Sequence, residues 1–66
     1  MKKYTLIEKR IINVLYYRQR PLTTYHLSKI TGYSYVTVRK YLHRLYDKGL
    51  LHYKTVGKSI YWWIKT

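Results

Sequence analysis

Apolar residues recur at intervals of three and four in the first part of the chain, the spacing that gathers them on one face of a helix. This apolar stripe consists of Ile7, Ile11, Ile12, Val14, Leu15 and Tyr16. Thr5 and Glu8 have the spacing of a capping box, so we predict a helix over about residues 5–17. The stripe is broader than one small core requires. Either the helix is simply well buried, or part of the stripe contacts a second copy of the chain.

A second, shorter helix is predicted over about residues 24–31. Thr23 precedes it as an N-cap residue, and Leu27 and Ile30 are spaced to face inward. Gly32 then supplies a turn, because glycine adopts positive φ at little cost.

A third helix is predicted over about residues 35–48, with Ser34 as its N-cap and Gly49 at the C′ position. The apolar residues spaced to face inward are Val38, Leu42 and Leu45. A capped helix, a tight glycine turn and a second capped helix in succession are the sequence pattern of a helix-turn-helix.

Beyond Gly49 the apolar positions alternate, which indicates β-strands, and Gly57-Lys58 is a suitable two-residue hairpin turn. We therefore predict strands over about 51–56 and 59–64. The expected pairs are Leu51–Ile64, Tyr53–Trp62 and Thr55–Ile60 on the more apolar face, and His52–Trp63 and Lys54–Tyr61 on the other. Trp63 is thus expected to point away from the core beside His52, and an exposed Trp indicates a partner surface.

Upstream, Pro21 restrains the residue before it to extended backbone. A short strand can therefore form near Pro21. The expected fold class is α+β: three helices followed by a C-terminal β-hairpin, in one domain over residues 1–66.

The charge of the chain is strongly one-sided. Its 66 residues include 14 Lys and Arg against two acids, for a net charge of +12. The cations are spread along the whole sequence, so the fold itself is positive, which favours nucleic acid as a partner. The absence of Cys excludes Cys-based zinc sites, and we expect neither metal nor cofactor. No apolar run suits a membrane span or a signal peptide, so we expect a cytoplasmic protein.

An ordered series of residues carries a resemblance to winged helix-turn-helix domains. The series is Ile11, Ile12, Leu15, Pro21-Leu22-Thr23, Leu27, Gly32, Ser34, Thr37-Val38, Leu42, Leu45, Gly49-Leu50-Leu51 and Tyr61-Trp62-Trp63-Ile64. It is similar to the DNA-binding cores of MarR, ArsR and PadR repressors, without the further helices that those families use for dimerisation or effector binding. In brevity and in its Tyr, Ile and Lys bias, the chain also resembles minimal winged-helix regulators of archaeal viruses and plasmids.

The resemblance implies that the third helix enters the major groove and that the hairpin, the wing, touches the minor groove or the backbone. Expected base-contacting residues are Tyr35, Val36, Arg39, Lys40 and His43. Expected phosphate-contacting residues are Thr24, Tyr25, Ser34, Thr37, Arg44, Lys54, Lys58 and Ser59. Expected dimer contacts are Ile7, Val14, Tyr16, Tyr61 and Trp63.

The leading hypothesis is a sequence-specific regulator that binds double-stranded DNA as a homodimer. A non-specific architectural or packaging protein is the first alternative, since charge alone gives non-specific affinity. Binding of RNA or single strands and a protein-interaction role are further alternatives. An enzyme is not expected, because the chain has no paired carboxylates and no nucleophile beside a base, and no small-molecule ligand is evident.

Overall fold

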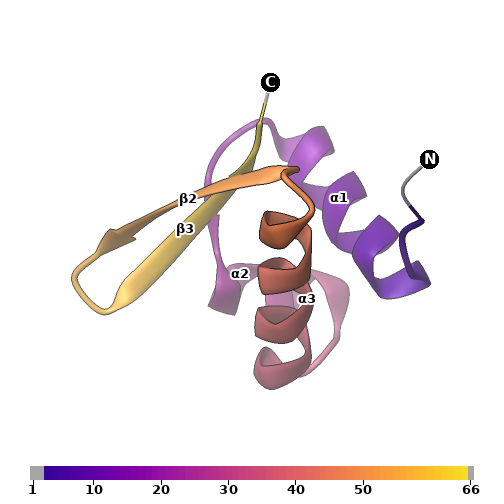
Figure 1. Ribbon diagram of the computed structural model, residues 1–66. Helices are drawn as coiled ribbons and strands as arrows, with labels where there is room; N and C mark the ends of the chain where they lie inside the picture. Colours follow the sequence, from indigo (N-terminus) through magenta and orange to yellow (C-terminus); the bar gives the residue numbers. More distant parts are fainter. Residues whose placement is uncertain (1–2, 66) are drawn as a thin grey trace.

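The computed structural model describes residues 3–65, and in this part of the chain three helices pack around one end of a three-stranded sheet (Figure 1). The elements in chain order are α1 (Leu6–Arg18), β1 (Leu22–Thr23), α2 (Thr24–Thr31), α3 (Tyr35–Asp47), β2 (Leu51–Val56) and β3 (Ser59–Ile64). The bounds of each helix agree with the predicted ones to within one residue. No helix in residues 3–65 is both long and apolar enough to cross a membrane.

Side chains predicted to cap the helices do so. The capping box of α1 is complete: Thr5 Oγ1 accepts from the Glu8 N–H at 3.1 Å, and Glu8 Oε1 accepts from the Thr5 N–H at 2.8 Å. Thr23 and Ser34 cap α2 and α3 in the same way. At the other end of α3, Gly49 has a φ of 80°, which an L-residue rarely adopts, and closes the helix as predicted.

The hairpin has the predicted register. Leu51 pairs with Ile64, Tyr53 with Trp62 and Thr55 with Ile60 around a two-residue turn. Gly57 opens this turn with a φ of 60°. The short strand near Pro21 is also present: β1 pairs with β3, so that β3 is the central strand in the order β1-β3-β2. The outer half of the hairpin extends beyond the helices (Figure 1), which makes it a wing in the structural sense.

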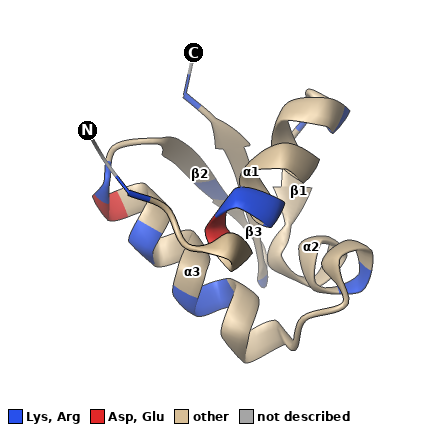
Figure 2. Ribbon diagram, turned by 90° about the vertical axis from the view of Figure 1, so that its right-hand side faces the viewer, with Lys and Arg blue, Asp and Glu red and all other residues tan. Residues whose placement is uncertain are grey.

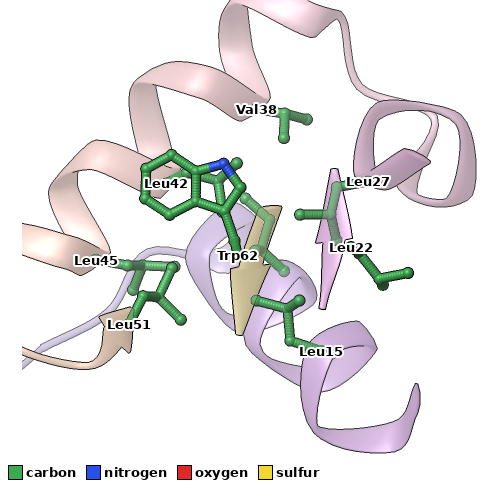
Figure 3. Packing of buried hydrophobic residues seen from close by; sticks show 9 residues of the cluster. Leu15, Leu22, Leu27, Val38, Leu42, Leu45, Leu51 and Trp62 are labelled. Atoms are coloured by element: carbon green, nitrogen blue, oxygen red, sulfur yellow. The ribbon is translucent and has the colours of Figure 1, made fainter. Parts of the chain in front are cut away.

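Trp62 lies at the centre of the core, between the helices and the inner end of the hairpin (Figure 3). Its indole Nε1–H donates to Thr24 Oγ1 at 3.0 Å, so its polar atom is satisfied inside the protein. The buried hydrophobic residues are Ile11, Leu15, Leu22, Leu27, Val38, Leu42, Leu45, Leu51 and Trp62. The prediction that Ile30 faces inward is wrong, because Ile30 is 40% exposed. The inward side of α2 is formed by Thr24, Leu27 and Thr31, and Ile30 lies beside that row rather than in it.

An ion pair joins the start of α1 to the end of α3. Glu8 is fully buried, and Lys48 Nζ lies 2.9 Å from its Oε2 atom. The same ammonium donates to the main-chain oxygen of Lys3 at 2.9 Å and lies 4.9 Å from the centre of the Tyr4 ring. Burial alone would raise the pKa of Glu8, but hydrogen bonds from Thr5 and Lys48, with the charge of Lys48, lower that pKa below its ordinary value. The carboxylate is therefore held in its charged form.

The Glu8–Lys48 pair should make stability depend on pH. Since the pKa of Glu8 is lower in the folded than in the unfolded protein, its contribution is complete above about pH 4.3 and is lost as the pH falls through the folded pKa. Lys48→Met should cost about 3 kcal/mol near pH 7, because it leaves a buried carboxylate without its cation. The difference in unfolding free energy between Lys48→Met and the parent protein should become smaller in acid, where Glu8 becomes protonated. Urea unfolding at several pH values measures it.

The matched control for that experiment is Lys9→Met, which removes one cation from an exposed position of α1. Its unfolding free energy should stay close to that of the parent protein at every pH. Equal behaviour of the two variants would contradict a stabilising role for the buried pair.

The hydrogen bond between Thr24 and Trp62 leads to a second prediction. Thr24→Val keeps the shape of the side chain but leaves the buried indole N–H without an acceptor, which should cost about 1–3 kcal/mol of unfolding free energy. Thr55→Val, at an exposed position of β2, is the matched control. If both variants unfold at the same urea concentration, the bond contributes nothing measurable.

Candidate nucleic-acid interface

The solvent-facing side of α3 carries all five of the residues expected to contact bases. Arg39, Lys40 and His43 are exposed, Tyr35 is 48% exposed and Val36 is 74% exposed. Figure 2 shows Lys and Arg at successive turns of this helix. The structure therefore brings the five expected base-contacting residues together on the exposed side of one element.

The exposed face of α3 has two sides that differ in their neighbours. Toward the hairpin, the His43 and Trp62 rings meet edge to face at 5.4 Å, and the Tyr46 and Tyr53 rings do so at 5.0 Å. Arg39 lies one turn before His43, on this same side. On the other side, Lys40 and Arg44 lie 5.9 and 5.3 Å from the centre of the Tyr41 ring.

Sequence reasoning missed the contact between α3 and the wing. Tyr53 also lies 5.2 Å from Trp62, so Tyr46, Tyr53, Trp62 and His43 form a continuous row of rings, the aromatic row. Two signals pointed to it: Tyr46 follows His43 by three residues, and the predicted register already paired Tyr53 with Trp62. The row fixes the wing beside the exposed face of α3.

The start of α3 carries two linked hydroxyls. Ser34 Oγ accepts from the Thr37 N–H at 3.2 Å, and it donates its own hydrogen to Thr37 Oγ1 at 2.9 Å. Since Ser34 has given its hydrogen away, Thr37 is the hydroxyl that keeps one to donate outward. Free N–H groups of this first turn also favour an anion.

The expected phosphate contacts of α2 are only half compatible with the structure. Tyr25 is 59% exposed, with Lys29 Nζ 5.3 Å from its ring centre. Thr24 is a correction: it is 3% exposed, and its hydroxyl accepts from Trp62 inside the core. Its side chain cannot reach a phosphate, because it is packed in the core and its hydroxyl oxygen is bound by the indole N–H of Trp62.

The cations of the wing lie apart from the helices. Lys54, Lys58 and Ser59 are exposed on the outer half of the hairpin, and Arg44 is exposed on α3. These four residues retain side chains free of the core, as a phosphate contact requires.

Within residues 3–65, no group of three His, Asp or Glu residues is arranged to hold a metal ion.

The residues expected at a dimer contact separate into two regions. Ile7 and Val14 are half-buried against the core from one side of α1. Tyr16 and Trp63 line a groove between the end of α1 and β3. Trp63 lies beside His52 as predicted, with ring centres 5.9 Å apart, but it is half-buried rather than freely exposed, because the end of α1 and Pro21 lie over that face of β3.

No protein-family model matches the chain, and no curated protein sequence does either. Solved structures match it. A structure of the DNA recognition and protein interaction domains of HOP2 aligns with a TM-score of 0.79 at 24% identity, over 89% of this chain and 98% of that one. The antimony-specific transcriptional repressor AntR aligns with a TM-score of 0.76 at 26% identity, over 86% of this chain and 50% of its own.

ZitR, a zinc-responsive MarR family member from Lactococcus lactis, aligns with a TM-score of 0.84 at 18% identity, over 97% of this chain and 45% of its own. A structure of a ZitR mutant in complex with DNA gives a TM-score of 0.82 at 18% identity, over 96% of this chain and 44% of that one. The chain thus spans nearly all of the HOP2 chain and half or less of the repressors. Its three helices and three-stranded sheet have the winged helix-turn-helix fold, as the sequence led us to expect.

Proposed function

We propose that this protein is a sequence-specific transcription regulator that binds double-stranded DNA as a homodimer in the cytoplasm. In the proposed complex, α3 lies in the major groove and the wing contacts the neighbouring minor groove or the backbone. The observation that carries the proposal is the exposed face of α3, where Arg39, Lys40 and His43 lie exposed beside Val36 on one element.

The types of side chain on this face suit base edges. Arg and Lys donate to guanine O6 and N7, and an apolar side chain such as Val36 can pack against a thymine methyl group. Arg39 is our first choice for a guanine, because it projects from the side of α3 that faces the wing. Lys40 and Arg44, which lie by Tyr41, suit the opposite flank.

In this proposal, the remaining cations and hydroxyls position the protein on the duplex by contacting phosphates. We assign phosphate contacts to Tyr25 at the start of α2, to Thr37 at the start of α3, to Arg44, and to the wing. Ser34 takes part by donating its hydrogen to Thr37, which leaves the Thr37 hydroxyl hydrogen for a phosphate. Each of these side chains lies outside the core, and Lys54, Lys58 and Ser59 on the wing are exposed. A structure of similar fold, that of a ZitR mutant, was solved in complex with DNA, which supports DNA as the partner. No catalytic role is proposed: Glu8 is buried in its ion pair and Asp47 lies alone at the end of α3.

The homodimer is proposed to form through one side of α1. Leu6 and Tyr17 are 72% and 87% exposed and lie three helical turns apart. They border the half-buried Ile7 and Val14, which makes a mainly apolar strip that Arg10 and Asn13 interrupt. Two copies related by a twofold axis could present two α3 helices to half-sites about 34 Å apart.

A non-specific architectural role is the second candidate, supported by the net charge of +12. Selection of bound duplexes from a random library, followed by footprinting at moderate salt, separates the two. A recurrent motif with a discrete protected site supports the regulator. A smear without a motif supports the architectural protein, and preference for single strands over duplex would contradict both.

Arg39→Ala provides the sharpest test of base contact. It should lower affinity for the selected site by about 1–3 kcal/mol and relax the preference at one base pair. Titration of matched and single-substituted duplexes at constant salt measures this change.

Lys9→Ala is the control for Arg39, since it removes one cation from the exposed side of α1. It should lower affinity slightly and equally for all sequences. If Arg39→Ala behaves in the same way, Arg39 contacts only phosphate.

The dimer is tested with the double variant Leu6→Ser with Tyr17→Ser. Because both side chains are mostly exposed, the fold should survive while self-association weakens by about tenfold or more, or about 1.4 kcal/mol. Sedimentation equilibrium measures it, with Tyr16→Ser as the control on the other side of α1. A parent protein that stays monomeric at high concentration would contradict the dimer and leave DNA binding untouched.

A further inference from the structure

Two neighbouring grooves lie where the end of α1 meets the sheet. The larger, of about 590 Å³, runs between α1 and β3, and its floor is apolar: Leu15, Pro21, Trp63 and Ile64. The smaller, of about 430 Å³, lies between Pro21, α2 and β3, with Leu22, Ile30 and Tyr61 as its apolar residues. Arg20 and Pro21 line both grooves, so together they form one elongated surface, the α1–β3 surface.

The charge of this surface has one sign. Lys65 lies at one end, Arg20 in the middle and Arg18 at the other end. No Asp or Glu lines either groove. The surface is therefore complementary to a ligand that carries several negative charges together with apolar groups.

The kinds of side chain also matter. Trp, Tyr and Arg are the residues that most often dominate binding energy at protein interfaces. Here Trp63 is half-buried in the floor, Tyr16 is 70% exposed at the rim and Arg20 is exposed between the two grooves. Ile30, which is 40% exposed, supplies an accessible aliphatic side chain to the second groove.

The location leaves the surface accessible when DNA is bound. In Figure 1 the end of α1 and the C-terminal end of β3 lie at the top, whereas α3 begins at the bottom and the wing extends to the side. An occupant of the larger groove would therefore approach from the end of the molecule opposite to the start of α3.

A second copy of the chain is a poor occupant. The copy has only two acids, Glu8 is fully buried, and Asp47 lies at the far end of α3. Docking two α1–β3 surfaces together would place Arg20 and Lys65 against like charges with no acid to compensate. The apolar strip of α1 proposed for the dimer lies on the other side of that helix, so the dimer leaves the grooves open.

A small molecule is also a weaker fit. Ligand sites of this kind bury most of their ligand, whereas these two grooves are open along their length and are separated by Arg20 and Pro21. Two shallow apolar depressions flanked by cations match a chain with two apolar anchors.

We propose that the α1–β3 surface docks an acidic segment of a partner protein, with one apolar side chain of that segment in each groove. Carboxylates of the segment pair with Arg20 and Lys65, and aromatic or aliphatic side chains pack against Trp63 and Ile30. The proposal does not depend on DNA binding.

The probe is a short synthetic peptide of Glu and Asp with one Phe and one Leu, and its control peptide has Ser in place of both. The acidic apolar peptide should bind at least about tenfold more tightly than the control. In proton–nitrogen NMR spectra the indole signal of Trp63 should shift on binding. The indole of Trp62, buried and bonded to Thr24, should not, and so serves as an internal reference.

Paired variants locate the site. Arg20→Gln with Lys65→Gln should weaken peptide binding by about fivefold or more, because both cations are exposed at the grooves. Lys54→Gln with Lys58→Gln, on the wing, removes the same charge and should change affinity less than about twofold. Since all four side chains are exposed, both proteins should fold.

Several results would overturn the proposal. Equal binding of the two peptides, or equal losses in the two double variants, would show attraction by net charge alone. An unmoved Trp63 indole would place the peptide elsewhere. Displacement of the peptide by duplex DNA would mean that it occupies the α3 face. Each of these results would leave the proposed DNA function standing, and absence of DNA binding would leave this surface standing.

Discussion

The burial of Trp62 is the constraint on which the rest of this small fold depends. Its indole is fully buried on the central strand, and its one polar atom is bonded to Thr24 at the start of α2. A chain of 66 residues has few places to hide so large a side chain. The helices and strands around Trp62 therefore have little freedom to move independently, and the aromatic row carries that constraint outward through Tyr53 to Tyr46 and the wing.

The large excess of positive charge is the second constraint. With 14 cations and two acids, most charges on this protein have no partner of opposite sign. One acid, Glu8, is buried inside the fold, where it completes the capping box of α1 and forms an ion pair with Lys48 at the end of α3. The remaining cations repel one another, which works against a compact chain. A bound anion reduces this repulsion between cations, and a polyanion such as DNA would reduce it most.

Local rules made much of the fold predictable. Helix caps at Thr5, Thr23 and Ser34, the glycine stop at Gly49 and the hairpin register all follow from side chains a few residues apart, and all are present. The exposed residues of α3 were found in the same way. The errors concern tertiary contacts. Thr24 had a hydroxyl suited to phosphate, but the indole that claims it lies 38 residues away in sequence.

The same limit applied to Trp63 and to the Glu8–Lys48 pair. Periodicity tells which face of a strand a residue occupies, so it placed Trp63 beside His52 correctly. It does not tell what covers that face, and the end of α1 does so here. Glu8 was assigned to its cap, yet its second oxygen binds a lysine 40 residues away. Spacing rules describe one element at a time, whereas these contacts form where two elements meet.

The two ends of the molecule combine charge with different surroundings. Around α3 and the wing, cations stand on convex, protruding elements, which suits a grooved polyanion whose phosphates and base edges are spread over a large surface. Around Arg20, cations border apolar depressions, which suits a flexible acidic chain that can bury side chains. In the two proposed complexes, net charge would attract both kinds of partner, and the shape beneath the charge would decide where each one binds. The two proposals are therefore compatible in one small winged helix, because they use surfaces of different shape.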